Sequence, residues 1–181
     1  TYTGPNGEVH LFWLQVNGEG RRCFGTYPCW DVWRAIISPT NPIPTAQIFF
    51  RVTAGAAEAP AVVFDSNGRG IGIFAYSDFD PFGPHTAGSP VEGRVTQMAA
   101  QFRNGSWGTP SVVNALQNYA TFNHIAMAPN GTAVVAWYEL SGFLYDTAGG
   151  VQQGDVTLKS RTWSADGSWG APLTVDTDHD S

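Results

Sequence analysis

Two Asn-Gly pairs, at positions 67–68 and 130–131, lie 63 residues apart, and each sits between two apolar runs. Asn-Gly between apolar, β-rich runs is a strong signal for a two-stranded hairpin, and a type I′ turn there needs positive φ at both central residues. A second shared segment, Trp-Gly-x-Pro, begins at Trp107 and again at Trp169, 62 residues later. We therefore expect one four-stranded antiparallel unit that occurs more than once in the chain.

A third and less regular copy begins the chain. Its Asn6-Gly7 pair lies 61 residues before the pair at 67–68, and its last two strands are expected at 32–37 and 46–52. The Trp-Gly-x-Pro segment is absent from this copy. The position seven residues after each Asn is aromatic in all three copies: Trp13, Phe74 and Trp137.

The apolar pattern within a copy predicts a sheet that is covered on both faces. Ile71, Ile73 and Ala75 alternate with Phe74 and Tyr76, so both sets of alternating side chains are apolar, whereas a sheet with one wet face alternates apolar and polar residues. Self-similarity at this period with four strands per copy is typical of β-propeller blades. We expect a single all-β domain with blades at 1–53, 60–113 and 122–175. A β-sandwich with similar turns is the alternative.

Three blades do not close a ring, because each terminal sheet would leave one large apolar face in water. The sequence therefore predicts either self-association into a six-bladed ring or flanking blades supplied by a longer chain. The chain does not begin with Met, as expected for a processed product or for a segment of a longer protein.

The repeat resembles those of bacterial extracellular propellers built from sialidase-type, or Asp-box-like, repeats. The likeness covers residues 60–175, and Ser164, Asp166, Gly167 and Trp169 follow the order of the Asp-box pattern, Ser-x-Asp-x-Gly-x-x-Trp. One residue is missing on each side of the Gly. The resemblance implies a propeller fold. It does not carry over the activity, because the arginine cluster that a sialidase needs cannot be assembled on one face from this sequence.

Charge and cysteine content restrict the partners. The net charge is −6, and no basic run or long apolar stretch is present, so we expect neither a nucleic-acid partner nor membrane insertion. Cys23 and Cys29 lie close together, and we expect them to form a disulfide, with two free thiols as the alternative. A disulfide implies an oxidising compartment, and we expect an extracellular or cell-surface protein.

The connections between second and third strands are long in every copy, at about 17–31, 77–94 and 141–155. They share one end of the sheets, where such folds bind ligands. Aromatic rings stack on sugar faces and carboxylates bind vicinal hydroxyls, so we expect a glycan or a surface protein as the partner. The alternative is that these side chains pack the loops onto their sheets. The candidate ligand contacts are Tyr27, Trp30, Asp31, Asp78, Phe79, Asp80, His85, Glu139, Tyr145 and Asp146.

Asp78 and Asp80 also have the spacing of calcium ligands, although a pair of turn-forming Asp residues explains them as well. No cofactor is otherwise expected. Among the carboxylates, nothing in the spacing selects a catalytic pair. The leading hypothesis is a non-catalytic, carbohydrate-binding module. The alternatives are a structural repeat module of a large surface protein, adhesin or filament, and a fragment of a sialidase-like glycoside hydrolase.

Overall fold

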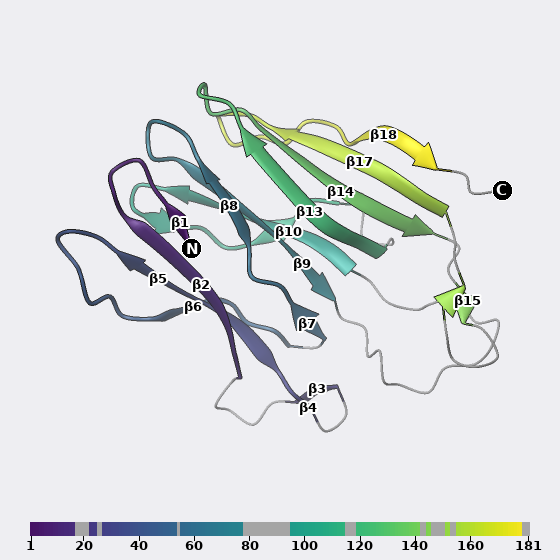
Figure 1. Cartoon of the computed structure of the whole chain (residues 1–181), viewed down its shortest axis with the longest axis horizontal. Coiled ribbons are helices and arrows are strands. Elements are labelled where there is room, and N and C mark those ends of the chain that lie inside the picture. Colours follow the sequence, from purple (N-terminus) through teal and green to yellow (C-terminus); the bar gives the residue numbers. More distant parts are fainter. Residues whose placement is uncertain are drawn as a thin grey trace.

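The computed structural model describes residues 1–16, 22–24, 27–53, 55–77, 95–114, 119–141, 144–145, 151–152 and 155–178. These residues form β-strands and turns, without a helix. The strands build three antiparallel sheets that follow one another along the chain (Figure 1). The all-β prediction is therefore confirmed.

The first sheet is a meander of four strands in chain order, which fits the irregular first copy of the repeat. Its strands are β1 (Tyr2–Thr3), β2 (Val9–Val16), β5 (Trp30–Ile37) and β6 (Gln47–Phe50). A small separate hairpin of β3 (Arg22–Phe24) and β4 (Tyr27–Pro28) lies in the connection between β2 and β5.

The second sheet keeps the same plan, but its first and last positions are each divided between two short strands. Both β7 and β8 pair with β9, and both β11 and β12 pair with β10. The strands are β7 (Ala56–Ala57), β8 (Ala61–Phe64), β9 (Gly70–Ser77), β10 (Val95–Arg103), β11 (Ser106–Trp107) and β12 (Ser111–Val112).

The third sheet is again a four-stranded meander, and its two central strands pair without interruption over nine residues each. Its strands are β13 (Tyr119–Met127), β14 (Ala133–Ser141), β17 (Asp155–Trp163) and β18 (Leu173–Asp178). The two-stranded ribbon of β15 (Leu144–Tyr145) and β16 (Val151–Gln152) lies between β14 and β17.

The predicted hairpins are present, but most of their turns are of another type. Only Asn104 and Gly105 both have positive φ, at 51° and 76°, as a type I′ turn requires. At 67–68 and 130–131 the Gly alone has positive φ among the two residues. In these turns the Gly N–H bonds the carbonyl three residues earlier, as in Gly68 to Asp65. The type I′ prediction is therefore wrong there, because a longer type I turn followed by a left-handed Gly closes the same strands.

The middle sheet is buried on both faces, as the alternating pattern predicted. Phe74 and Met98 face the first sheet, where they join one apolar cluster. Ile71 and Ile73 face the third sheet, where they join a second cluster that includes Trp137. Successive residues of β9 therefore point to different neighbours, and the three sheets stack in chain order through two apolar interfaces (Figure 1).

A buried histidine lies within the first of these interfaces. His10 is fully buried, and its Nδ1 accepts a hydrogen bond of 3.2 Å from the indole Nε1 of Trp107. Nδ1 therefore carries no proton, and the neutral ring holds its proton on Nε2, which lies 3.8 Å from Oε1 of Glu8. Burial lowers the pKa of His10 below its ordinary value of 6.5, the charge of Glu8 opposes that shift, and Arg34 adds to it.

The burial of a neutral His10 predicts that the folded protein loses stability in acid. As the pH falls below about 6.5 the unfolded chain takes up a proton on His10 while the folded chain does not, so the free energy of unfolding decreases toward lower pH. Urea denaturation at pH 7.5 and at pH 5.5 measures this difference. His10→Gln removes this contribution, whereas the control His124→Gln, at an exposed position, keeps it. An equal pH dependence in wild type and His10→Gln would contradict the assignment.

Candidate functional site

The two ends of the sheets differ in the connections that join their strands. The turn end carries the short hairpin turns 4–8, 65–69, 103–106, 128–132 and 164–168 and the connection 38–46 between β5 and β6. At the opposite end, the loop end, β2, β9 and β14 finish and β5, β10 and β17 begin (Figure 1). Strands of eight or nine residues separate the two ends, which corresponds to about 25–30 Å.

The predicted disulfide lies at the loop end. Cys23 and Cys29 are bonded, with their Cα atoms 4.9 Å apart, so that prediction is confirmed. Beside it, Trp30 is 47% exposed and forms a cross-strand pair with Val16, which is 39% exposed. Trp30 therefore offers an open apolar surface of the kind that the sequence predicted for ligand contact. Its role in binding stays a prediction.

Two predicted ligand carboxylates are engaged inside the fold. Asp31 is 1% exposed, and its Oδ1 accepts a hydrogen bond of 2.9 Å from the backbone N–H of Val52. Glu139 is 9% exposed and accepts a hydrogen bond of 3.2 Å from the indole of Trp137. Each carboxylate thus satisfies a buried donor of the fold, the backbone of Val52 just after β6 or the indole of Trp137 in β14. A role for either in ligand binding is not needed to explain its position.

Of the other predicted ligand contacts, two lie in short strands and five lie outside the described residues. Tyr27 and Tyr145 lie in β4 and β15, two short strands of the loop end. Asp78, Phe79, Asp80, His85 and Asp146 lie outside the described residues, and so does the predicted calcium site. Among the described residues, no group of three or more His, Cys, Asp or Glu side chains could hold a metal ion.

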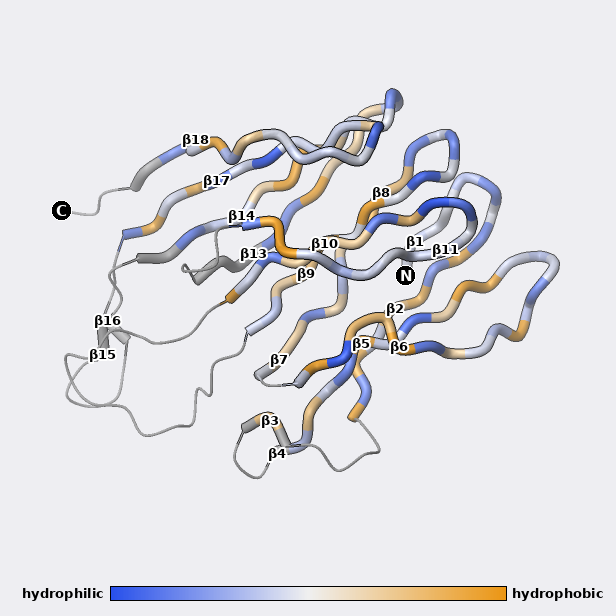
Figure 2. The backbone as a smooth tube through the Cα atoms, turned by 180° about the vertical axis from the view of Figure 1, so that it is seen from behind, coloured by the Kyte–Doolittle hydropathy of each residue, from blue (hydrophilic) through white to orange (hydrophobic). Residues whose placement is uncertain are grey.

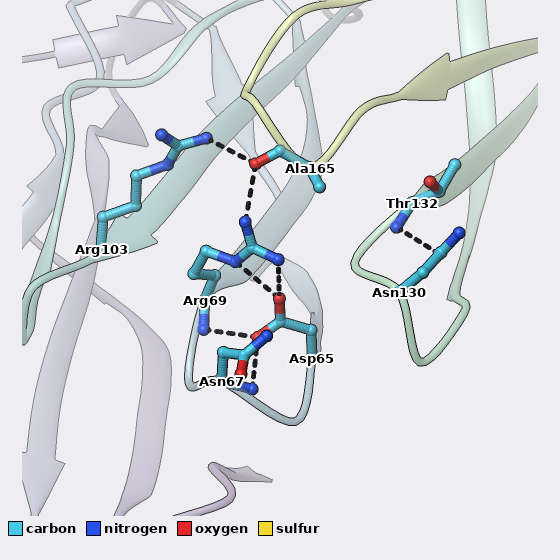
Figure 3. A network of polar contacts seen from close by, with 7 residues as sticks. All are labelled: Asp65, Asn67, Arg69, Arg103, Asn130, Thr132 and Ala165. Carbon is cyan, nitrogen blue, oxygen red and sulfur yellow. Dashed lines mark hydrogen bonds and ion pairs between the residues drawn. The ribbon is translucent and has the colours of Figure 1, made fainter.

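At the turn end, Asp65 organises a polar network that the sequence analysis did not single out (Figure 3). It is 3% exposed. Its Oδ1 accepts hydrogen bonds of 2.9 Å from the backbone N–H groups of Asn67 and Arg69, and its Oδ2 accepts one of 2.7 Å from Nε of Arg69. Burial acts to raise the pKa of Asp65, but the hydrogen bonds and charge of Arg69 outweigh it, so the pKa lies below its ordinary value.

The same network joins the second sheet to the third. The backbone carbonyl of Ala165 accepts hydrogen bonds from Arg69 at 2.9 Å and from Arg103 at 3.4 Å (Figure 3). Next to it, the carbonyl of Gly167 accepts one of 3.1 Å from the side chain of Gln101. The turn at 164–168 is therefore held by side chains of the preceding sheet, which is a structural role.

At the turn end, side chains of the second sheet bridge to the third sheet, whereas the space between the first and second sheets forms a cleft. A cleft of about 800 Å³ lies there, and we call it the turn-end cleft. All four hairpin turns of these two sheets contribute to its wall. The residues that line it are Asn6, Glu8, Ser38, Pro39, Thr40, Asn67, Gly68, Arg69, Phe102, Arg103, Asn104 and Gly105.

The wall of the turn-end cleft mixes hydrogen-bond donors with acceptors. Three Asn side chains, two hydroxyls and a carboxylate line it. The carboxylate belongs to Glu8, which is 9% exposed, and its Oε2 accepts no hydrogen bond from the described residues. The sequence signal for this site was the Asn that recurs in the turns, which we interpreted only as a turn former.

No family model, curated protein or solved structure matches this chain. Within the described residues, no helix is long and apolar enough to cross a membrane.

Proposed function

We propose that this protein is a non-catalytic module that binds carbohydrates, with the turn-end cleft as the ligand site. The observation that carries the proposal is the cleft itself, whose volume of about 800 Å³ falls in the range of ligand pockets. Its lining comes from four turns that two packed sheets hold in place, so the side chains are positioned before any ligand arrives.

The chemistry of the lining favours a polyhydroxylated ligand. Sugar hydroxyls both donate and accept hydrogen bonds, and an amide side chain offers both functions at once. Asn6, Asn67 and Asn104 supply amides, and Ser38 and Thr40 supply hydroxyls. Two cationic side chains also line the cleft, and both are engaged elsewhere. Arg69 is paired with Asp65 at 2.6 Å, and Arg103 donates to the carbonyl of Ala165 and lies over the ring of Trp163. The disulfide at the other end of the molecule is compatible with an extracellular protein.

We also propose that the three sheets are consecutive blades of a β-propeller. Support comes from the strand order, because each sheet runs through the chain as an antiparallel meander. The double burial of the middle sheet adds to this, since a blade packs against a neighbour on each face. A two-sheet sandwich would leave one face of each sheet to solvent.

A glycan array with matched variants tests the function and its site. We expect Asn6→Ala and Asn67→Ala each to weaken binding of a captured glycan by about tenfold, the loss of one or two hydrogen bonds. Asn130→Ala is the control, because it occupies the equivalent turn of the third sheet outside the cleft. The array signals are then confirmed by calorimetry.

The outcomes separate the two ends of the molecule. If Trp30→Ala abolishes binding while Asn6→Ala and Asn67→Ala leave it unchanged, the ligand site lies at the loop end and the cleft assignment is wrong. If the folded wild-type chain binds no glycan, carbohydrate recognition itself is wrong.

A structural role in a larger surface assembly is the second candidate. The outer face of the third sheet favours it, because Val134 and Leu173 there are 46% and 60% exposed. Additional sheets of the same kind would cover such a face in a repeat array.

A further inference from the structure

The outer face of the third sheet carries exposed apolar side chains. In β14, Val134 and Tyr138 alternate with the buried Val135 and Trp137, so they point away from the second sheet. The strand register places Leu173 of β18 opposite Ser160 of β17, which itself pairs with Ala136. Exposed fractions of 38% for Tyr138 and 60% for Leu173 show how much of this face meets solvent.

The first sheet has an outward face of its own, at the other end of the stack. His10 and Phe12 of β2 point to the second sheet, and Leu11 and Trp13 therefore point outward. Trp33 of β5 pairs with Trp13, and their rings stack with centroids 6.5 Å apart. The hydropathy of the two terminal sheets can be followed in Figure 2.

The repeat shows that these two faces are halves of one kind of interface. The residue four positions after the turn Asn faces the next sheet: His10 in the first copy and Ile71 in the second. The residue seven positions after it faces the previous sheet: Phe74 in the second copy and Trp137 in the third. By the same rule, Val134 faces a sheet after the third, and Trp13 faces a sheet before the first.

We propose that the outer face of the third sheet packs against the outer face of the first sheet of a second copy of this chain. Such a contact continues the interfaces already present between the first and second sheets and between the second and third. Two copies related by a two-fold axis form this contact twice, once at each end of the stack, and so close a ring of six sheets. Six lies within the usual range of about four to eight blades. The inference rests on the blade arrangement proposed above and is independent of what the turn-end cleft binds.

The composition of the two faces supports a close, dry contact. The outward positions near the centres of the two faces are Leu11, Trp13 and Trp33 on one sheet and Val134, Ala136, Tyr138 and Ser160 on the other. None of these side chains is charged, so burial of the centres removes apolar surface from water. The ionisable side chains of the third sheet's outer face lie on its edge strands, His124 on β13 opposite Ala136 and Asp176 on β18 opposite Leu158. Two tryptophans on the first sheet would meet mostly small and branched residues on the third. The interface between the second and third sheets has the same kind of pairing, because Trp137 packs there with Ile71 and Ile73.

Light scattering of the 181-residue chain at micromolar concentration tests the assembly. We expect a particle with twice the chain mass of 19.5 kDa. Val134→Lys and Trp13→Glu each place a charge in one face and should each give a monomer. Ser66→Glu, on an exposed turn outside both faces, is the control and should remain dimeric. Tyr138→Lys provides a second variant of the third sheet if Val134→Lys does not fold.

Mixing the two charged variants tests the pairing of the faces. In a ring, one contact of the mixed dimer brings the introduced lysine against the introduced glutamate, and the other contact is wild type at both positions. The mixture should therefore recover dimers that neither variant forms alone. We expect the mixture to form dimers at a protein concentration about tenfold lower, or lower still, than either variant needs alone. Failure of the mixture to dimerise would overturn the pairing of unlike faces. A soluble wild-type monomer would overturn the second copy as partner, and an open, larger assembly would overturn ring closure.

Discussion

Replacing Trp107 by Ala is expected to lower the free energy of unfolding by about 4 kcal/mol, the usual cost of truncating a buried Trp. Trp107 lies between the first and second sheets and is 7% exposed. Its ring contacts four phenylalanines edge-on or tilted: Phe12, Phe49, Phe64 and Phe102, at centroid distances of 5.5, 5.7, 6.2 and 5.3 Å. Truncation opens a cavity that strands from both sheets line and that cannot collapse without moving them.

The same change also removes a buried hydrogen-bond donor. Nδ1 of His10 would lose its bond from the indole and remain buried, which adds to the cost of the cavity. Urea denaturation followed by tryptophan fluorescence and circular dichroism measures the loss. Trp30→Ala is the matched control, because Trp30 is 47% exposed and its truncation should change stability by less than about 1 kcal/mol. A loss below about 1 kcal/mol for Trp107→Ala would show that the interface between the first two sheets does not depend on this ring.

Replacing Asp65 by Ala is expected to lower the free energy of unfolding by about 3 kcal/mol, because breaking a buried pair leaves its partner without compensation. Asp65 is 3% exposed, and Arg69 contacts its Oδ2 at 2.6 Å. The substitution also leaves the backbone N–H groups of Asn67 and Arg69 without their acceptor. The turn 65–69 and its contact with Ala165 should then loosen together.

A double-mutant cycle distinguishes this network from a simple loss of packing. Arg69→Ala in the Asp65→Ala background should cost less than in the wild type, because the unpaired cation is removed. Asp166→Ala is the control, since Asp166 caps an equivalent turn through hydrogen bonds from Ser168 but is exposed to solvent. Additive losses in the cycle would contradict a coupled network.

The sign of the pH dependence follows from the lowered pKa of Asp65. Its stabilising contribution is complete above the ordinary pKa of 3.8 and is lost as the pH falls through the lower, folded-state value. The loss from His10 begins nearer neutral pH, below 6.5. The contributions of His10 and Asp65 therefore act in separate pH ranges. Hydrogen bonds from Ser168 lower the pKa of Asp166 as well, so the comparison of Asp65→Ala with the wild type isolates the contribution of Asp65.

The amino-acid sequence by itself determined the strands, the hairpins and the double burial of the middle sheet. These features are local. Alternation of Ile71 and Ile73 with Phe74 assigns side chains to two faces, and a left-handed Gly such as Gly68 reverses the chain over four or five residues. The disulfide between Cys23 and Cys29 was predictable for the same reason, since the two residues are only 6 positions apart along the chain.

Tertiary structure alone decided which turns meet. Glu8 and Asn104 line one cleft although almost a hundred positions separate them, and Arg69 reaches the carbonyl of Ala165, 96 residues later. It also decided that Asp31 and Glu139 are buried inside their sheets. Local propensity does not encode such contacts, because the distance between two turns depends on how closely the apolar faces of neighbouring sheets pack. That packing depends on every side chain in the interface at once.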